Sequence, residues 1–139
     1  MPDTEGPTQV SKTTRILIVD DSVAIIDELK EILSNDNNEV ITAGNGEEGL
    51  NILLSDTEID VCISDVNMPV MNGFEMLEAL REKAPENTAP IFMLTTEFDR
   101  DSKRRGKELG IKGWVVKPFD HARMLQCISL VTGKNHDLS

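Results

Sequence analysis

The sequence predicts an α/β fold in which one doubly wound, five-stranded parallel sheet is covered by five helices. Five short apolar runs alternate along the chain with five segments of helical period, and this alternation is typical of parallel strands joined by right-handed crossovers. The runs at 16–19 and 61–64 are almost entirely apolar, which indicates strands buried on both faces. A length of 139 residues is enough for one domain with one core.

The first half of the chain is predicted to hold three strands and two helices. The first strand covers 15–19, and Ser22 can cap the helix that follows it. The apolar face of that helix has a 3.6-residue period and consists of Ile25, Leu29, Ile32 and Leu33. The helix ends in the polar segment 34–38, which indicates a loop. The other elements of this half are a strand at 39–43, a helix around 47–54 and a strand at 59–64.

The second half is predicted to hold three helices and two strands. A helix at 74–83 is bounded by loop signals and by Pro85, and its apolar face contains Phe74, Leu77 and Leu80. The elements after it are a strand at 91–94, a polar helix around 99–109, a strand at 113–116 and a last helix around 120–131. The residues of the last helix that we expect to face inward are Leu125, Ile128 and Val131, and Gly133 is the expected stop.

The termini and the cysteines indicate a cytoplasmic protein with one domain. Residues 1–14 read as a disordered lead-in without the apolar core of a signal peptide. The domain is expected at 15–132, followed by a short tail at 133–139. No apolar run approaches the roughly 18 residues of a membrane span. Cys62 and Cys127 share no motif, so we expect two buried thiols in a reducing compartment.

The charge balance argues against a nucleic-acid-binding module. The chain has 14 Lys and Arg against 25 Asp and Glu, a formal net charge of −11, which repels a polyanion. Basic residues do cluster at 103–105 and Lys107. This cluster is either a solvated helix face or a docking patch for an acidic partner.

Polar residues follow four of the five predicted strands, at the edge where parallel-sheet proteins place their sites. Asp20 and Asp21 follow the first strand, and Asp65 follows the third. Thr95 and Lys117 follow the fourth and fifth. Each residue alone could be a turn or a helix cap, but caps do not explain all four together. Three carboxylates in one crevice repel each other unless a cation lies among them, and Mg²⁺ prefers such oxygen ligands.

This constellation is suited to phosphoryl transfer. A carboxylate can act as the nucleophile and form an aspartyl phosphate. Lys117 and the metal would neutralise the charge of the phosphoryl group, and the Thr95 hydroxyl could donate a hydrogen bond to it. A loop carbonyl near Asn67 could complete the metal shell.

The residues that carry this constellation resemble the receiver domain of two-component response regulators, in particular the stand-alone CheY type of chemotaxis. Four segments match: 16–22 with Asp20 and Asp21, 65–77 from Asp65 to Leu77, 93–97 with Thr95, and 113–119 with Lys117 and Pro118. The match covers about residues 14–132 in register. It implies a flavodoxin-like (βα)5 fold with strand order 2-1-3-4-5.

The resemblance implies a role for each matching residue. Asp65 would be the phosphoacceptor, and Asp20, Asp21, Asp65 and the backbone carbonyl of Asn67 would hold Mg²⁺. Asp65, Thr95 and Lys117 would form the reactive group of residues. The bond from Lys117 to Pro118 is expected to be cis. Trp114 would be the aromatic residue that moves together with Thr95.

Four positions depart from the usual residues of the family or tune its chemistry. Trp114 stands where the family usually has a smaller ring, so its inward position needs more room, and a packing or partner-contact role is the alternative. Thr96 stands where small residues are common and would narrow access to the site. Asn67 and Glu97 match the two positions that tune hydrolysis of the aspartyl phosphate. This pair resembles those of family members whose aspartyl phosphate has a short lifetime.

The resemblance also implies partners. A CheA-type histidine kinase would phosphorylate Asp65, the flagellar motor switch protein would bind the product, and a chemotaxis phosphatase is a further candidate. No nucleic acid and no membrane insertion are expected, and the domain is expected to be a monomer. The only chemistry expected is self-phosphoryl transfer and autodephosphorylation, so the protein would not be an enzyme. The alternative is a stand-alone receiver that serves as a phosphorelay intermediate, a phosphate sink or a regulator of something other than the motor.

Two other classes fit less well. Phosphatases of the haloacid dehalogenase type have a spacer between their two aspartates and a separate cap domain, whereas Asp20 and Asp21 are adjacent. A flavin-binding flavodoxin would need a phosphate-cradling loop after the first strand, and Asp20-Asp21-Ser22 does not resemble one.

Overall fold

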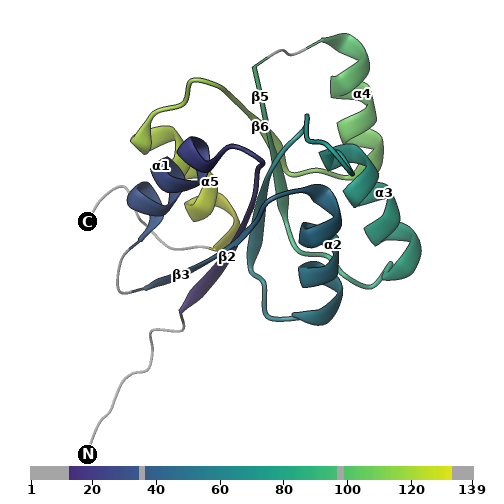
Figure 1. Ribbon diagram of the computed structural model, residues 1–139, viewed down its shortest axis with the longest axis horizontal. Coiled ribbons are helices and arrows are strands. Elements are labelled where there is room, and N and C mark those ends of the chain that lie inside the picture. Colours follow the sequence, from purple (N-terminus) through teal and green to yellow (C-terminus); the bar gives the residue numbers. More distant parts are fainter. Residues whose placement is uncertain (1–12, 35–36, 97–98, 133–139) are drawn as a thin grey trace, which may run out of the picture.

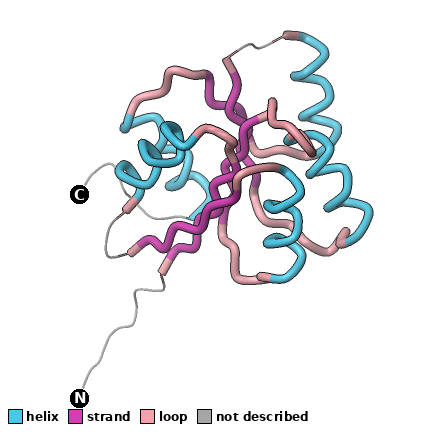
Figure 2. The backbone as a smooth tube through the Cα atoms, in the orientation of Figure 1, coloured by secondary structure: helices cyan, strands magenta, loops and turns pink. Residues whose placement is uncertain are grey.

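A computed structural model of the chain describes residues 13–34, 37–96 and 99–132. It contains one five-stranded parallel sheet in the order β3-β2-β4-β5-β6, which is the order 2-1-3-4-5 when the strands are counted along the chain. The sheet runs through the middle of the molecule, with helices on both of its sides (Figures 1 and 2). The predicted fold class and strand order are therefore confirmed.

Each strand follows an apolar run of the sequence. The strands are β2 (Thr14–Val19), β3 (Asn38–Ala43), β4 (Val61–Asp65), β5 (Ile91–Thr95) and β6 (Gly113–Val116). The central strands β4 and β5 are buried along their whole length, as their continuous apolar sequences predict. The register pairs Val19 with Ser64 and Asp65 with Leu94. The carboxyl ends of β2, β4 and β5 therefore lie next to one another.

The helices form two layers, one on each face of the sheet. The helices are α1 (Val23–Leu33), α2 (Gly46–Ser55), α3 (Gly73–Lys83), α4 (Arg100–Leu109) and α5 (His121–Thr132). One core cluster lies between the sheet and α2 and α3, and the other lies between the sheet and α1 and α5. In α4 only Gly106 is buried, because the rest of its sequence is strongly polar.

Side-chain caps begin the helices where the sequence indicates. Ser22 caps α1 by accepting a hydrogen bond from the backbone N–H of Ile25 at 3.3 Å. Asn72 and Glu75 form a reciprocal capping box at the start of α3, with hydrogen bonds of 2.8 and 2.9 Å. Asp99 caps α4, and Gly110 ends it with φ +80°, a backbone conformation that favours glycine.

Several element bounds differ by one or two residues from the sequence-based expectations, and the strands expected at 39–43 and 91–94 are each one residue longer, at Asn38–Ala43 and Ile91–Thr95. Strand β2 begins at Thr14 rather than at 15, because the Thr14 N–H donates to the carbonyl of Asn37 at 2.7 Å. Strand β4 begins at Val61 and includes Asp65, which was expected to follow it. In α5 the buried residues are Met124, Cys127 and Ile128. The predicted inward residues Leu125 and Val131 are only partly buried and flank this stripe.

Both cysteines are buried and free, as predicted. Within the three described ranges, no helix is long and apolar enough to cross a membrane. The predicted N-terminal lead-in up to residue 12 and the tail at 133–139 lie outside the described residues.

Candidate functional site

Three carboxylates converge at the carboxyl ends of β2 and β4. Asp20 and Asp21 directly follow β2, and Asp65 is the last residue of β4. One oxygen of each side chain lies within 4.8 Å of the other two. Asp20 and Asp65 are buried, whereas Asp21 is exposed. Two of the three charges are therefore withheld from water, which increases their repulsion.

Asp20 is held rigidly, but one of its oxygens accepts no hydrogen bond. The backbone N–H of Asp20 donates to the carbonyl of Ala43 at 3.0 Å. Its Oδ1 accepts a hydrogen bond from the N–H of Ser22 at 2.9 Å. Its Oδ2 is buried and has no hydrogen-bond partner among the residues that the structure describes. A buried carboxylate oxygen in this state is costly unless a cation lies close to it.

Lys117 places a positive charge against two of the carboxylates. It directly follows β6, and its N–H donates to the carbonyl of Thr95 at 2.8 Å. Its Nζ lies 3.4 Å from Oδ1 of Asp65 and 3.5 Å from Oδ2 of Asp20. The peptide bond between Lys117 and Pro118 is cis, as expected. The ammonium group therefore offsets part of the negative charge of the crevice.

The pKa of Asp65 is raised above its ordinary value. Burial is the main cause, and the neighbouring charge of Asp20 adds to it. Lys117 opposes the shift through its charge and its hydrogen bond, and a hydrogen bond from the backbone of Asn67 opposes it further. A carboxylate with few stabilising contacts and an elevated pKa is a better nucleophile than a fully paired one.

The segment after Asp65 is packed against the start of α3. A Cβ atom on Gly73 would lie 2.5 Å from the carbonyl oxygen of Asp65, so only glycine fits there. The Gly73 N–H donates to the carbonyl of Val66 at 2.9 Å. The buried hydroxyl of Ser64 donates to the Asp65 carbonyl at 2.9 Å. These contacts fix the backbone on both sides of Asp65.

Thr95 and Trp114 lie on the two strands beyond β4. Thr95 is the buried last residue of β5, one position past the register partner of Asp65. Trp114 lies in β6 and is partly buried. Its ring centroid is 6.0 Å from that of Phe74 in an edge-to-face arrangement at 68°. Trp114 therefore has a packing role toward α3.

The donor set fits a hard divalent cation such as Mg²⁺. Three carboxylate oxygens lie within 4.8 Å of one another, and such oxygens are the ligands that Mg²⁺ prefers. The buried Oδ2 of Asp20 needs a positive neighbour, and Lys117 at 3.5 Å makes no hydrogen bond to it. The exposed position of Asp21 leaves the crevice open to solvent, so a bound Mg²⁺ could keep several waters.

The comparison with known families identifies the family of the chain. The model of the response regulator receiver domain matches residues 16–129, a range that includes the three aspartates, Thr95 and Lys117. The chain belongs to this family. Receiver domains belong to two-component signalling, and the structural and sequence relatives below place this one with the CheY type.

Curated relatives of this receiver domain include chemotaxis and transcription proteins. It is 32% identical over 106 residues to a chemotaxis protein CheY homolog of Campylobacter jejuni, and the match covers 76% of this chain and 82% of that protein. It is 34% identical over 122 residues to the transcriptional regulatory protein CpxR of Escherichia coli. That match covers 88% of this chain but 50% of CpxR, so the chain spans about half the length of that relative.

A solved structure of a chemotaxis protein is similar over nearly its whole length. The chemotaxis protein CheY4 of Vibrio cholerae superposes on this receiver domain with a TM-score of 0.78 and 41% sequence identity. The match covers 86% of this chain and 98% of the CheY4 chain.

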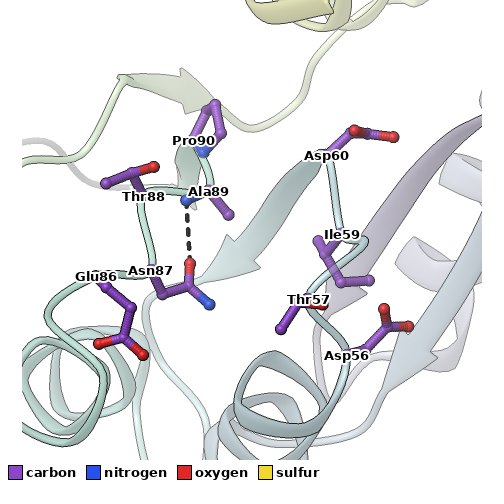
Figure 3. Close-up of a pocket in the computed structure, with 9 residues that line it drawn as sticks. All are labelled: Asp56, Thr57, Ile59, Asp60, Glu86, Asn87, Thr88, Ala89 and Pro90. Carbon is purple, nitrogen blue, oxygen red and sulfur yellow. Dashed lines mark hydrogen bonds between the residues drawn. The ribbon is translucent and has the colours of Figure 1, made fainter.

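A cavity also lies at the opposite edge of the sheet, but it is not the candidate functional site of this receiver domain. It has a volume of about 340 Å³ and lies next to the amino ends of β4 and β5 (Figure 3). Its lining residues are Asp56, Thr57, Ile59, Asp60, Glu86, Asn87, Thr88, Ala89 and Pro90. The Asp56 carboxylate is paired with Arg15, and the Asn87 side chain accepts a hydrogen bond from the N–H of Ala89 at 3.0 Å. These polar groups are used within the fold.

The structure brings together most of the predicted site residues. Asp20, Asp21, Asp65 and Lys117 surround one crevice, and Asn67 contacts Asp65 through its backbone. Thr96 is exposed, and Glu97 lies outside the described residues. The sequence reasoning missed the structural roles of Ser64 and Gly73. Asn72-Gly73 did indicate a turn, but nothing local indicated that Gly73 would touch the Asp65 carbonyl.

Proposed function

We propose that this receiver domain is a phosphorylation switch of the chemotaxis type, in which Asp65 accepts a phosphoryl group in a Mg²⁺-dependent reaction. The phosphodonor would be a CheA-type histidine kinase, and the phosphorylated form would bind the flagellar motor switch protein. The observation that carries this proposal is the position of Asp65, which lies with Asp20 and Asp21 within 4.8 Å and has Lys117 at 3.4 Å.

The proposed reaction moves one phosphoryl group and uses only side chains of this crevice. A carboxylate oxygen of Asp65 attacks the phosphorus of a phosphorylated histidine nitrogen. The O–P bond forms while the P–N bond breaks, and the departing nitrogen takes a proton from water. In the resetting step, water attacks the phosphorus and the O–P bond to Asp65 breaks. The Asp65 carboxylate is regenerated, and inorganic phosphate leaves with both protons of the water. The domain would thus catalyse only its own modification.

The residues around Asp65 have distinct proposed roles. Mg²⁺, when bound by Asp20, Asp21, Asp65 and the Asn67 carbonyl, supplies positive charge to the phosphoryl oxygens. Lys117 leaves its contact with Asp20 or Asp65 and pairs with a phosphoryl oxygen. The Thr95 hydroxyl donates a hydrogen bond to another. Asn67 and Glu97 control the access of the water that hydrolyses the aspartyl phosphate, and this pair favours a short lifetime of the phosphorylated form.

Phosphorylation of the domain can be tested directly. The protein is incubated with Mg²⁺ and either a phosphorylated CheA-type kinase or acetyl phosphate, and the incorporated phosphate is measured. Wild-type protein should be labelled and Asp65→Asn should not. Asp27→Asn, which removes an exposed carboxylate on α1, is the matched control and should be labelled normally. Labelling of Asp65→Asn at the wild-type level would disprove the assignment of Asp65.

A second candidate is a receiver that regulates something other than the motor or passes its phosphate onward. The observation in its favour is that the identity to the transcriptional regulator CpxR, 34%, is as high as the identity to the CheY homolog, 32%. Immobilised protein, phosphorylated and unphosphorylated, would be tested for binding to motor switch protein and to a phosphotransfer protein. Phosphorylation-dependent capture of the motor protein supports the first candidate, and capture of only the phosphotransfer protein supports the second.

A further inference from the structure

Trp114, the single tryptophan of the chain, contacts residues of three helices, α3, α4 and α5. Its ring meets the Phe74 ring of α3 edge-on, with centroids 6.0 Å apart. A Cβ atom on Gly106 of α4 would lie 2.7 Å from Cζ2 of the indole, so α4 approaches the ring as closely as a glycine permits. Arg123 of α5 donates a hydrogen bond to the Trp114 carbonyl at 3.4 Å. Movement of α4 relative to α3 would therefore displace the indole.

Arg105 joins α4 to the same aromatic pair. Its guanidinium carbon lies 4.7 Å from the centroid of the Phe74 ring, within the range of a cation–π contact. Its Nη2 also donates to Oε2 of Glu78 on α3 at 2.8 Å. Phe74 therefore contacts both Arg105 and Trp114. One side chain of α4 thus makes two separate attachments to α3.

These attachments matter because α4 has little apolar packing of its own. Gly106 is its only buried residue, and Leu109, which is partly buried against the core, is its only hydrophobic side chain, so hydrophobic burial holds α4 only weakly. The carbonyl of Leu109 accepts a hydrogen bond from Nε of Arg81 at 3.0 Å, which fixes the C-terminal end of α4 to α3. Arg105 contacts α3 one turn earlier, beside Trp114. A helix held by a few polar contacts can take a second position at low cost.

The start of α3 connects this cluster to the site. Phe74 follows Gly73, and Gly73 lies directly against the Asp65 carbonyl oxygen, where a Cβ would approach to 2.5 Å. A change in the backbone at Asp65 therefore reaches Phe74 through one peptide unit. This contact path runs through α3 and does not involve Thr95.

We propose that Arg105 is a positioning residue that holds α4 and Trp114 against Phe74 and so couples the packing of Trp114 to the state of Asp65. The coupling rests on the proposed phosphorylation of Asp65, whereas the packing role of Arg105 does not. The ion pair and the cation–π contact each contribute a small free energy. Together they can shift the balance between two positions of α4 without being needed for folding.

The experiment uses the intrinsic fluorescence of Trp114 in the full-length protein. Arg105→Ala removes both contacts to α3. Arg104→Ala is the matched control, because among the described residues Arg104 pairs with Asp101 of its own helix, at 2.7 Å, and with no residue of α3. It is also the same residue type on the same helix. Acrylamide quenching is measured without any phosphodonor. The spectral change is then measured on adding Mg²⁺ and beryllium trifluoride, a mimic of the phosphoryl group, and ¹⁹F NMR reports whether the mimic is bound.

Arg105→Ala should raise the acrylamide quenching constant about twofold and reduce the mimic-induced spectral change by about half while the mimic still binds. Arg104→Ala should match wild-type protein in both measurements. Wild-type quenching and a full spectral change in Arg105→Ala, or equal effects of both substitutions, would overturn the proposal. If wild-type protein does not bind the mimic, the proposed function and the coupling are both overturned, and the quenching constants still decide the packing role.

Discussion

Lys117 lies between two buried carboxylates, with its Nζ 3.4 Å from Asp65 and 3.5 Å from Asp20. These distances make Lys117 a partner of the proposed metal ligands as well as of the proposed phosphoacceptor. The lysine lowers the pKa of Asp65, which burial and Asp20 raise. Its ammonium group is therefore already positioned where phosphoryl charge would appear.

Replacing Lys117 should impair phosphorylation more than folding. We expect Lys117→Met to slow incorporation of phosphate from acetyl phosphate by roughly 10²-fold, the usual effect of removing one group that stabilises developing charge. The exposed lysine Lys112 provides the control, because Lys112→Met should keep the wild-type rate. A Lys117→Met protein that is phosphorylated at the wild-type rate would contradict the role assigned here.

Mg²⁺ should stabilise the protein through Asp20. At a Mg²⁺ concentration of 100 times its dissociation constant, binding should add about 2.7 kcal/mol to the free energy of unfolding. In Asp20→Asn this gain should disappear. The metal-free variant should unfold at a higher temperature than metal-free wild-type protein, since the substitution removes a buried like charge that raises the pKa of Asp65. Thermal unfolding with and without Mg²⁺ measures both effects, and an unchanged response of Asp20→Asn to Mg²⁺ would refute the ligand assignment.

Gly73→Ala should damage both stability and the site. The added Cβ would meet the backbone oxygen of Asp65 at 2.5 Å, and backbone cannot move aside as a flexible side chain can. We expect a loss of about 2 kcal/mol in the free energy of unfolding and slower phosphorylation. Gly44→Ala is the comparison, because the nearest atom to its added Cβ would be 3.8 Å away. Equal stability of the two variants in urea denaturation would argue against the close approach.

Val70→Asn should stabilise the protein. Val70 has φ 74° and is 73% exposed, so a β-branched residue is held in the left-handed region without burying its side chain. Relief of that strain should raise the free energy of unfolding by about 1 kcal/mol. Val23 is 72% exposed in α1, and Val23→Asn should give no such gain. Urea denaturation of both variants measures the two changes in the free energy of unfolding. Equal changes would show that Val70 is not strained.

The two cysteines should be unreactive in the folded state. Burial raises the pKa of the Cys62 thiol to about 12 and also raises that of Cys127. Neither should react with a thiol reagent at pH 8 until the protein unfolds. Because the folded pKa of Cys62 exceeds its ordinary value of 9.0, its contribution to stability is complete below pH 9 and is lost as the pH rises toward 12. Rapid labelling of native protein at pH 8 would show that the thiols are accessible.

Much of the fold and of the site could be predicted because short stretches of sequence determine where the strands lie and which residues stand at their ends. Apolar runs determined the five strands, and Asp20 and Asp65 stand at strand ends whose meeting follows from parallel topology alone. The face of α5 could not be predicted in this way. Leu125 and Met124 both fit a helical period, and only the neighbouring sheet selects Met124 for burial.

The sequence by itself therefore determined the element order, the acidic cluster and the presence of Thr95 and Lys117 at the same edge. Only the tertiary structure decided that Lys117 contacts both Asp20 and Asp65, that Gly73 touches the Asp65 carbonyl, and that Arg105 and Trp114 meet on Phe74. The physical reason is the separation along the chain of the residues that interact. Periodicity and strand ends depend on residues close in the chain, whereas these contacts join residues from different elements and depend on how the helices pack on the sheet.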